Sequence, residues 1–124
     1  MMNSDLLPAG KLPNALLYRL LRRFTADDAR LLVGPQMGVD AAVIDMGATY
    51  LVAKTDPITF ATDAIGWYAV NVNANDIAVM GATPRWFMAT VLLPAGKTTS
   101  ALAEAIYDQI AAACADAGIA FTVA

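Results

Sequence analysis

The sequence contains no histidine and a single cysteine, Cys114. The lack of histidine excludes Ser-His-Asp and Cys-His nucleophile systems and the common histidine-based zinc sites. One cysteine cannot form a disulfide within the chain and is typical of a reducing compartment, so we expect a cytoplasmic protein. Ionic chemistry must therefore come from carboxylates, lysine, arginine, amides and the backbone, a set of groups that suits Mg²⁺ and a polyphosphate.

Charged residues are also scarce. They make up 15% of the chain, against 58% hydrophobic residues, whereas ordinary soluble domains have about 25% and about 45–50%. The net charge of −3 comes without a long basic block, so nothing marks a nucleic-acid surface. Every apolar run is interrupted well before the roughly 20 residues of a membrane-spanning helix, and no signal peptide is visible. We attribute the apolar surplus to an interface with another chain or domain.

The length of 124 residues is enough for one domain, which we place at 13–124 behind a mobile segment, 1–12. Hydrophobic periodicity and Gly/Pro punctuation predict its elements. The predicted helices are 13–24, about 64–81 (capped by Thr62 or Asp63) and about 100–117 (capped by Thr98, Thr99 or Ser100 and ended by Gly118). The predicted strands are about 40–46 and 49–55, joined as a hairpin at Gly47-Ala48, then 84–93 and the final run 119–124.

The predicted strand 84–93 is apolar on both faces. Phe87 and Val91 lie on one face, and Trp86, Met88 and Leu92 lie on the other. Such a strand must be covered on both sides. We therefore predict an α+β fold with a mixed, mainly antiparallel sheet, covered on one face by two long helices. A partner subunit in a homodimer would complete the sheet and cover its other face.

Three aspartates have unusual sequence settings. Asp40 lies at the entry to a strand, Asp56 precedes a proline at the end of a strand, and Asp76 lies inside an apolar helix. A buried carboxylate needs a cation or strong donors, and three converging acids would make a Mg²⁺ site for phosphate oxygens. Asp40 and Asp56 are equally compatible with turns, and Asp76 with an exposed position. The residues alone leave this choice open.

Other polar residues accompany these acids. Asn71, Asn73 and Asn75 alternate with apolar residues in one helix, although asparagine is a poor helix former. A functional site retains such a cost, and a solvated helix face would explain it as well. Lys54, at the end of a strand, is a candidate to pair with phosphate or with an acid. Lys11 is either a flexible cationic lid over phosphates or simply an exposed lysine.

Three segments containing these residues resemble a known family. They are GVDAAVI (38–44), KTDPITFAT (54–62) and NVNANDIAVMGATPRWF (71–87). In order and spacing they are similar to the N-terminal domain of the AIR synthase superfamily, which includes thiamine-monophosphate kinase, selenide-water dikinase and the hydrogenase expression/formation dehydratase. The KTDPIT wording most resembles the hydrogenase-maturation branch. The resemblance implies an α+β domain that dimerises through its sheet, with ATP at the dimer interface and Mg²⁺ on acidic residues.

The resemblance also implies roles position by position. Val39 stands where many members have a second acid. The implied Mg²⁺ ligands are Asp40, Asp56 and Asp76, and the implied phosphate-binding residues are Lys54, Thr55, Asn75 and, by a looser match, Lys11.

The functional hypothesis is enzymatic. In the hydrogenase-maturation interpretation, ATP would drive dehydration of a carrier-bound carboxamide to a nitrile, and in a kinase-type member ATP would phosphorylate a small molecule. The chain ends within a strand, and the C-terminal domain of the family is absent from it. We therefore expect a truncated domain with little or no turnover. The alternative is a non-catalytic dimerising module that senses a nucleotide or serves as an assembly surface.

Overall fold

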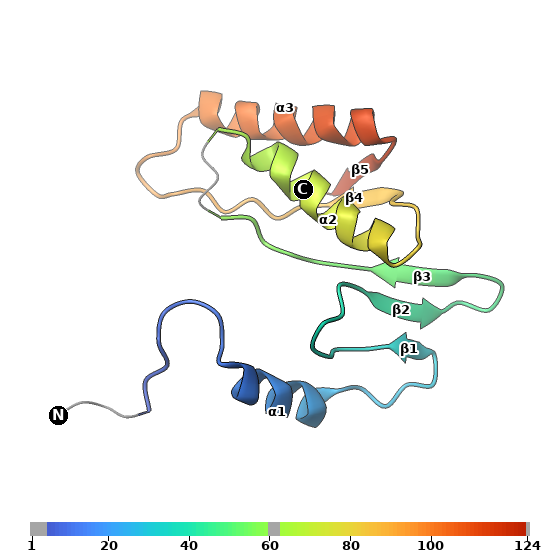
Figure 1. The fold of residues 1–124 in the computed structure, drawn as a ribbon. Coiled ribbons are helices and arrows are strands. Elements are labelled where there is room, and N and C mark those ends of the chain that lie inside the picture. Colours follow the sequence, from blue (N-terminus) through green and yellow to red (C-terminus); the bar gives the residue numbers. More distant parts are fainter. Residues whose placement is uncertain (1–4, 60–62, 124) are drawn as a thin grey trace.

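A computed structural model describes residues 5–59 and 63–123 of the chain (Figure 1). Within these residues the order of elements is α1–β1–β2–β3–α2–β4–α3–β5, which confirms the predicted α+β class. The helices are α1 (Asn14–Phe24), α2 (Ile65–Val79) and α3 (Ser100–Ala117). The strands are β1 (Leu31–Val33), β2 (Ala42–Asp45), β3 (Tyr50–Ala53), β4 (Trp86–Met88) and β5 (Ala120–Val123).

Strands β1, β2 and β3 form an antiparallel sheet in that order. The predicted β2–β3 hairpin is present, with Ala42 opposite Ala53 and Asp45 opposite Tyr50. Its turn contains Gly47 at φ 92°, a left-handed conformation that glycine adopts without steric cost, and the Gly47 N–H donates to Asp45 Oδ1 at 2.8 Å. Strand β1 has no counterpart among the predicted strands, because three residues are too few to show a period.

Strands β4 and β5 form a second, parallel sheet. They are connected through α3, as a parallel pair requires a long crossover. The prediction of one mixed sheet is therefore corrected to two sheets among the described residues. The predicted strand 84–93 was also too long: β4 covers only Trp86–Met88, because the four-residue β5 is its partner and offers ladder bonds over that short stretch alone.

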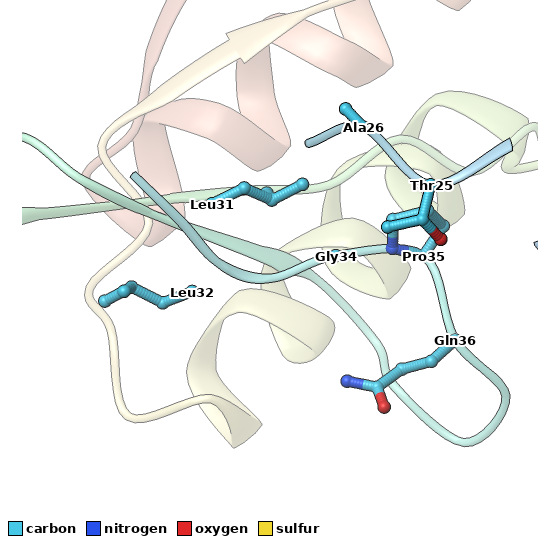
Figure 2. Close-up of a pocket in the computed structure, with 7 residues that line it drawn as sticks. All are labelled: Thr25, Ala26, Leu31, Leu32, Gly34, Pro35 and Gln36. Atoms are coloured by element: carbon cyan, nitrogen blue, oxygen red, sulfur yellow. The ribbon is translucent and has the colours of Figure 1, made fainter. Parts of the chain in front are cut away.

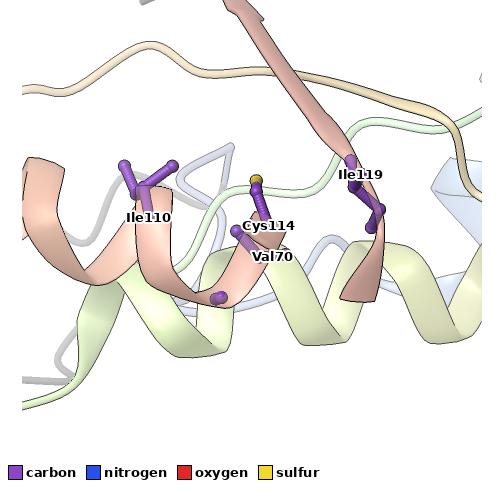
Figure 3. Close-up of a cluster of buried hydrophobic side chains, with 5 residues drawn as sticks. Val70, Ile110, Cys114 and Ile119 are labelled. Carbon is purple, nitrogen blue, oxygen red and sulfur yellow. The ribbon is translucent and has the colours of Figure 1, made fainter. Parts of the chain in front are cut away.

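The core lies where α2 and α3 pack together and the parallel sheet meets them. Figure 3 shows Val70 of α2 facing Cys114 of α3, with Ile110 and Ile119 on either side. Val70 is fully buried and Cys114 is 2% exposed, so the single thiol is a packing residue whose pKa is raised by burial. Partly buried Phe87 and Phe121 extend this core onto β4 and β5.

Gly66 of α2 lies directly against the backbone of α3. A Cβ added there would lie 2.8 Å from the Ile106 carbonyl oxygen and 2.9 Å from the Ile110 nitrogen. The Gly66 N–H donates to Gln109 Oε1 at 3.0 Å, and Gln109 Nε2 donates to the Asp63 carbonyl at 3.1 Å. A glutamine of α3 therefore satisfies the first turn of α2.

The start of α2 agrees with the predicted start near residue 64, but the capping residue differs from the predicted Thr62 or Asp63. The N-cap position of α2 is Ala64, and no side chain of that residue caps the helix. Of the two predicted caps, Thr62 lies outside the described residues, and Asp63 immediately precedes the observed N-cap position. For α3 the prediction holds: Thr99 Oγ1 accepts from the Leu102 N–H at 3.1 Å, and Gly118 ends the helix at φ 68°, as expected for a left-handed C-cap.

The N-terminal part lies on the far side of the three-stranded sheet from α2 (Figure 1). Helix α1 is amphipathic, has Arg22 and Arg23 in its last turn and contributes no fully buried residue. Residues 5–12 of the predicted mobile segment form no helix or strand, and residues 1–4 lie outside the described part. None of the helices that the structure describes is long and apolar enough to cross a membrane.

Candidate functional site

The best-defined polar cluster joins the end of β3 to α2. Lys54 directly follows β3, and the connection that continues from it runs alongside α2 (Figure 1). The Lys54 Nζ atom lies 2.8 Å from Asp76 Oδ2 and 3.9 Å from Asp56 Oδ2. Lys54 of the KTDPIT segment is thereby paired with an acid 22 positions later in the chain.

The ion pair is largely shielded from solvent. The Lys54 and Asp76 side chains are 18% and 23% exposed, whereas Asp56 is 42% exposed. The hydrogen bond to Asp76 raises the pKa of Lys54 above its ordinary value, against the effect of burial, and the charges of Asp76, Asp56 and Asp40 add to the rise. The lysine is therefore held as a cation.

Asp40 belongs to the electrostatic surroundings of this lysine. It is exposed and precedes the buried Ala41 at the start of β2. The β2–β3 register pairs Ala42 with Ala53, which places Asp40 and Thr55 at the same end of this strand pair. One ammonium and three carboxylates leave a local charge of two negative units.

Asn73 of α2 fixes the position of the loop that carries Asp56. Its Nδ2 donates to the Asp56 carbonyl at 3.2 Å and to the Ala69 carbonyl at 2.8 Å. Its Oδ1 is buried and has no hydrogen-bond partner among the described residues. Asn71 makes only the local bond, from Nδ2 to the Trp67 carbonyl at 2.9 Å. Bonds to the i−4 carbonyl explain how asparagine is tolerated inside the helix.

The remaining predicted phosphate-binding residues are exposed, unlike the largely shielded Lys54. Thr55 and Asn75 are exposed neighbours in sequence of Asp56 and Asp76. Lys11 is exposed in the segment before α1, across the three-stranded sheet from α2 (Figure 1). Asn73 was noticed in the sequence only as one of three alternating asparagines. Its role in holding the Asp56 loop follows from its hydrogen bond to the Asp56 carbonyl. No local sequence pattern indicates that contact.

The donor set can be compared with what Mg²⁺ requires. Across residues 5–59 and 63–123, no group of three or more acid, histidine or cysteine side chains could hold a metal ion. Mg²⁺ commonly uses one or two carboxylates and takes its other ligands from water and substrate phosphates. Asp56 and Asp76 direct one oxygen each at a common cation, the Lys54 ammonium. This pair of hard oxygen ligands fits a metal shared with phosphates.

Two open pockets lie away from this cluster. The one in Figure 2, of about 330 Å³, is lined by Thr25, Gly34 and Gln36 with neighbouring apolar residues. Another, of about 400 Å³, is lined by Arg30, Asp45, Met46 and Gly47. Neither brings together acids with a free cation, since Arg30 is paired with Asp28 at 2.9 Å. The candidate site is therefore the Lys54–Asp56–Asp76 cluster, which is defined by its ion pairs and not by a pocket.

Fold and site together define an α+β domain in which one lysine is ion-paired with two acids. Residues 38–123 match the family described as "AIR synthase related protein, N-terminal domain". The chain belongs to this family, and the matched region contains Asp40, Lys54, Asp56 and Asp76.

Two curated relatives are similar to most of the chain. It is 36% identical over 81 residues to a thiamine-monophosphate kinase of Synechococcus elongatus, covering 63% of this chain and 23% of the relative. It is 33% identical over 114 residues to a selenide, water dikinase of Haemophilus influenzae, covering 89% of this chain and 32% of the relative. The chain thus spans a third or less of these proteins. No solved structure gives a significant match.

Proposed function

We propose that this chain is the Mg²⁺–nucleotide-binding part of a kinase-type phosphoryl-transfer protein, with its site at Lys54, Asp56 and Asp76. The observation that carries the proposal is the ion-paired cluster itself. The ammonium contacts acids from two separate segments at 2.8 and 3.9 Å, and both segments lie inside the family match. Both relatives are kinases by name, which favours phosphoryl transfer.

In this proposal the acids bind the metal ion, and the lysine and its polar neighbours bind phosphate. Asp56 and Asp76 would hold the metal, which neutralises and orients the phosphates of a nucleoside triphosphate when it is bound. Asp40 adds negative charge to the same region. Lys54 and the exposed Thr55 and Asn75 supply donors to phosphate oxygens. Positioning and charge neutralisation are the main contributions of a protein to phosphoryl transfer.

The acceptor of the phosphoryl group is outside this proposal. The two relatives are named for chemically unrelated acceptors, thiamine monophosphate in one and selenide with water in the other. The resemblance to the hydrogenase-maturation branch gains no support from these two relatives. We therefore propose the nucleotide half of the reaction and favour the kinase-type chemistry.

We also propose that the chain forms a homodimer through the open face of the β4–β5 sheet. Phe87 and Phe121 face the core, while Trp86, Met88 and Val123 are 68%, 73% and 58% exposed. Large apolar side chains gathered on one face are typical of a protein interface. In sedimentation we expect a dimer at micromolar concentration and a monomer for Trp86→Glu. A wild-type monomer would refute this interface.

Calorimetry on the intact chain tests nucleotide binding. We expect ATP to bind with Mg²⁺ at least tenfold more tightly than without it, and Asp56→Asn and Asp76→Asn to lose most of this gain, because each removes one charged ligand. Asp108→Asn, which removes an exposed acid of α3, is the matched control and should bind as wild type does. Metal-independent binding that neither site variant weakens would refute the assignment.

A further inference from the structure

The Lys54 ammonium lies beside both acids that are proposed to hold the metal ion. Both distances, 2.8 Å to Asp76 and 3.9 Å to Asp56, are measured from the Oδ2 atoms to the same Nζ atom. Mg²⁺ binds oxygen at about 2.0–2.1 Å, so an ion bound to Asp76 Oδ2 competes for that oxygen with the ammonium 2.8 Å away. The metal ion and the Lys54 ammonium would also repel each other strongly when both lie next to the same carboxylate.

The backbone of both acids is anchored to α2. Asn73 ties the Asp56 backbone to α2 by the 3.2 Å bond to its carbonyl, and Asp76 is itself part of α2. Lys54 reaches them at the end of a flexible four-carbon side chain. The ammonium can therefore move away while the backbone positions of both acids are kept.

A displaced ammonium needs a new anion. The Lys54 side chain is only 18% exposed, and a shielded charge without a partner is costly. Phosphate oxygens next to the metal would provide that partner, whereas a metal ion arriving alone would provide none.

We propose that Lys54 is a resident counter-ion that a divalent cation must displace, so that this site binds metal weakly alone and tightly together with a polyphosphate. The proposal rests on the function proposed for the same acids. It gives Lys54 a second role besides binding phosphate. The lysine offsets one of the two negative charges of the acid pair and selects the metal–polyphosphate complex over the free metal ion.

The first test measures Mn²⁺ affinity by electron paramagnetic resonance at constant pH. Lys54→Met removes the competing cation and should bind Mn²⁺ alone about tenfold more tightly than wild type, the equivalent of one charged hydrogen bond. Lys97→Met removes an exposed lysine before α3 and should bind as wild type does. If wild type binds Mn²⁺ alone and Lys54→Met binds it no more tightly, the proposal is overturned.

The second test uses the wild-type chain and does not depend on how well the variant folds. The sequence has three lysines, so the ¹⁵Nζ spectrum is simple. The ion-paired Lys54 signal should keep its position with Mg²⁺ alone at concentrations where little binds. It should shift when Mg²⁺ and tripolyphosphate are added together. Metal and tripolyphosphate binding that leaves this signal unchanged would show that the ammonium is not displaced.

The two levels of the proposal fail in different ways. If neither wild type nor Lys54→Met binds Mn²⁺ or Mn²⁺–tripolyphosphate, the proposed function fails, and the counter-ion role fails with it. If Mn²⁺–tripolyphosphate binds through Asp76, as loss of binding in Asp76→Asn would show, while Lys54→Met behaves like Lys97→Met, only the counter-ion role fails.

Discussion

Replacing Gly66 by alanine should destabilise the protein, although alanine is the better helix former. The substituted Cβ would lie 2.7 Å from Gln109 Cβ and 2.8 Å from the Ile106 carbonyl oxygen. Ordinary contacts between such atoms are about 3.5–4.0 Å, so α3 has to retreat by about 1 Å. Because the obstacles include backbone atoms of α3, no side-chain rotation relieves them.

The magnitude follows from three opposing effects. Overpacking of this kind costs about 1–3 kcal/mol, and loss of the bond between the Gly66 N–H and Gln109 Oε1 costs about 1 kcal/mol. Alanine returns about 1 kcal/mol of helix propensity. The expected net loss is about 1–3 kcal/mol, which lowers the melting temperature by roughly 4–12 °C for a domain of this size.

Thermal and urea unfolding followed by circular dichroism give the assay. Gly34→Ala is the matched control, because the Cβ added there meets the flexible end of Leu31 at 3.0 Å and no backbone atom, and its stability should change by less than about 0.5 kcal/mol. A Gly66→Ala protein as stable as wild type would refute the close approach of α2 and α3. The packing of α2 against α3 matters for the candidate site because Asp76 is part of α2.

Three further predictions concern single residues. Thr99→Ala removes the cap of α3 and should cost about 1 kcal/mol in the free energy of unfolding, measured by urea titration; an unchanged value would contradict the cap. The salt bridge to Arg30 lowers the pKa of Asp28 from 3.8 to about 2, so the stability it contributes is present above pH 3.8 and lost as the pH falls toward 2. Carboxyl ¹³C NMR should show this titration, and Arg30→Ala should return it to the ordinary range. The raised pKa of Lys54 makes the contribution of its ion pair complete below pH 10.5 and lost as the pH rises through the folded-state value. Stability curves of wild type and Asp76→Asn should therefore converge at strongly alkaline pH, and curves that stay parallel there would contradict the pairing.

The order and type of most elements could be predicted from local sequence. Helix α3 follows from its apolar period between Thr99 and Gly118, whose cap geometries are as expected. The β2–β3 hairpin follows from alternation around Gly47. These features depend on interactions between residues close in the chain, which is why the sequence reports them.

Other features depend on contacts between distant residues. The short β1, the early end of β4 and the parallel pairing with β5 are set by which strand supplies a partner. The start of α2 is capped by Gln109, 43 positions away from Gly66, so no local motif marks it.

The candidate site shows the same division. The residues alone made Asp56 and Asp76 candidates for a site, because acids in apolar surroundings need a cation, and the family resemblance gave them their proposed role as Mg²⁺ ligands. The residues also made Lys54 a candidate to pair with phosphate or with an acid. Only the tertiary structure selected Asp76 as its partner and tied Asp56 to α2 through Asn73. Sequence determined which chemical groups the chain carries, and folding decided which of them meet, because their separation in space is fixed by the packing of α2 and not by their spacing in the chain.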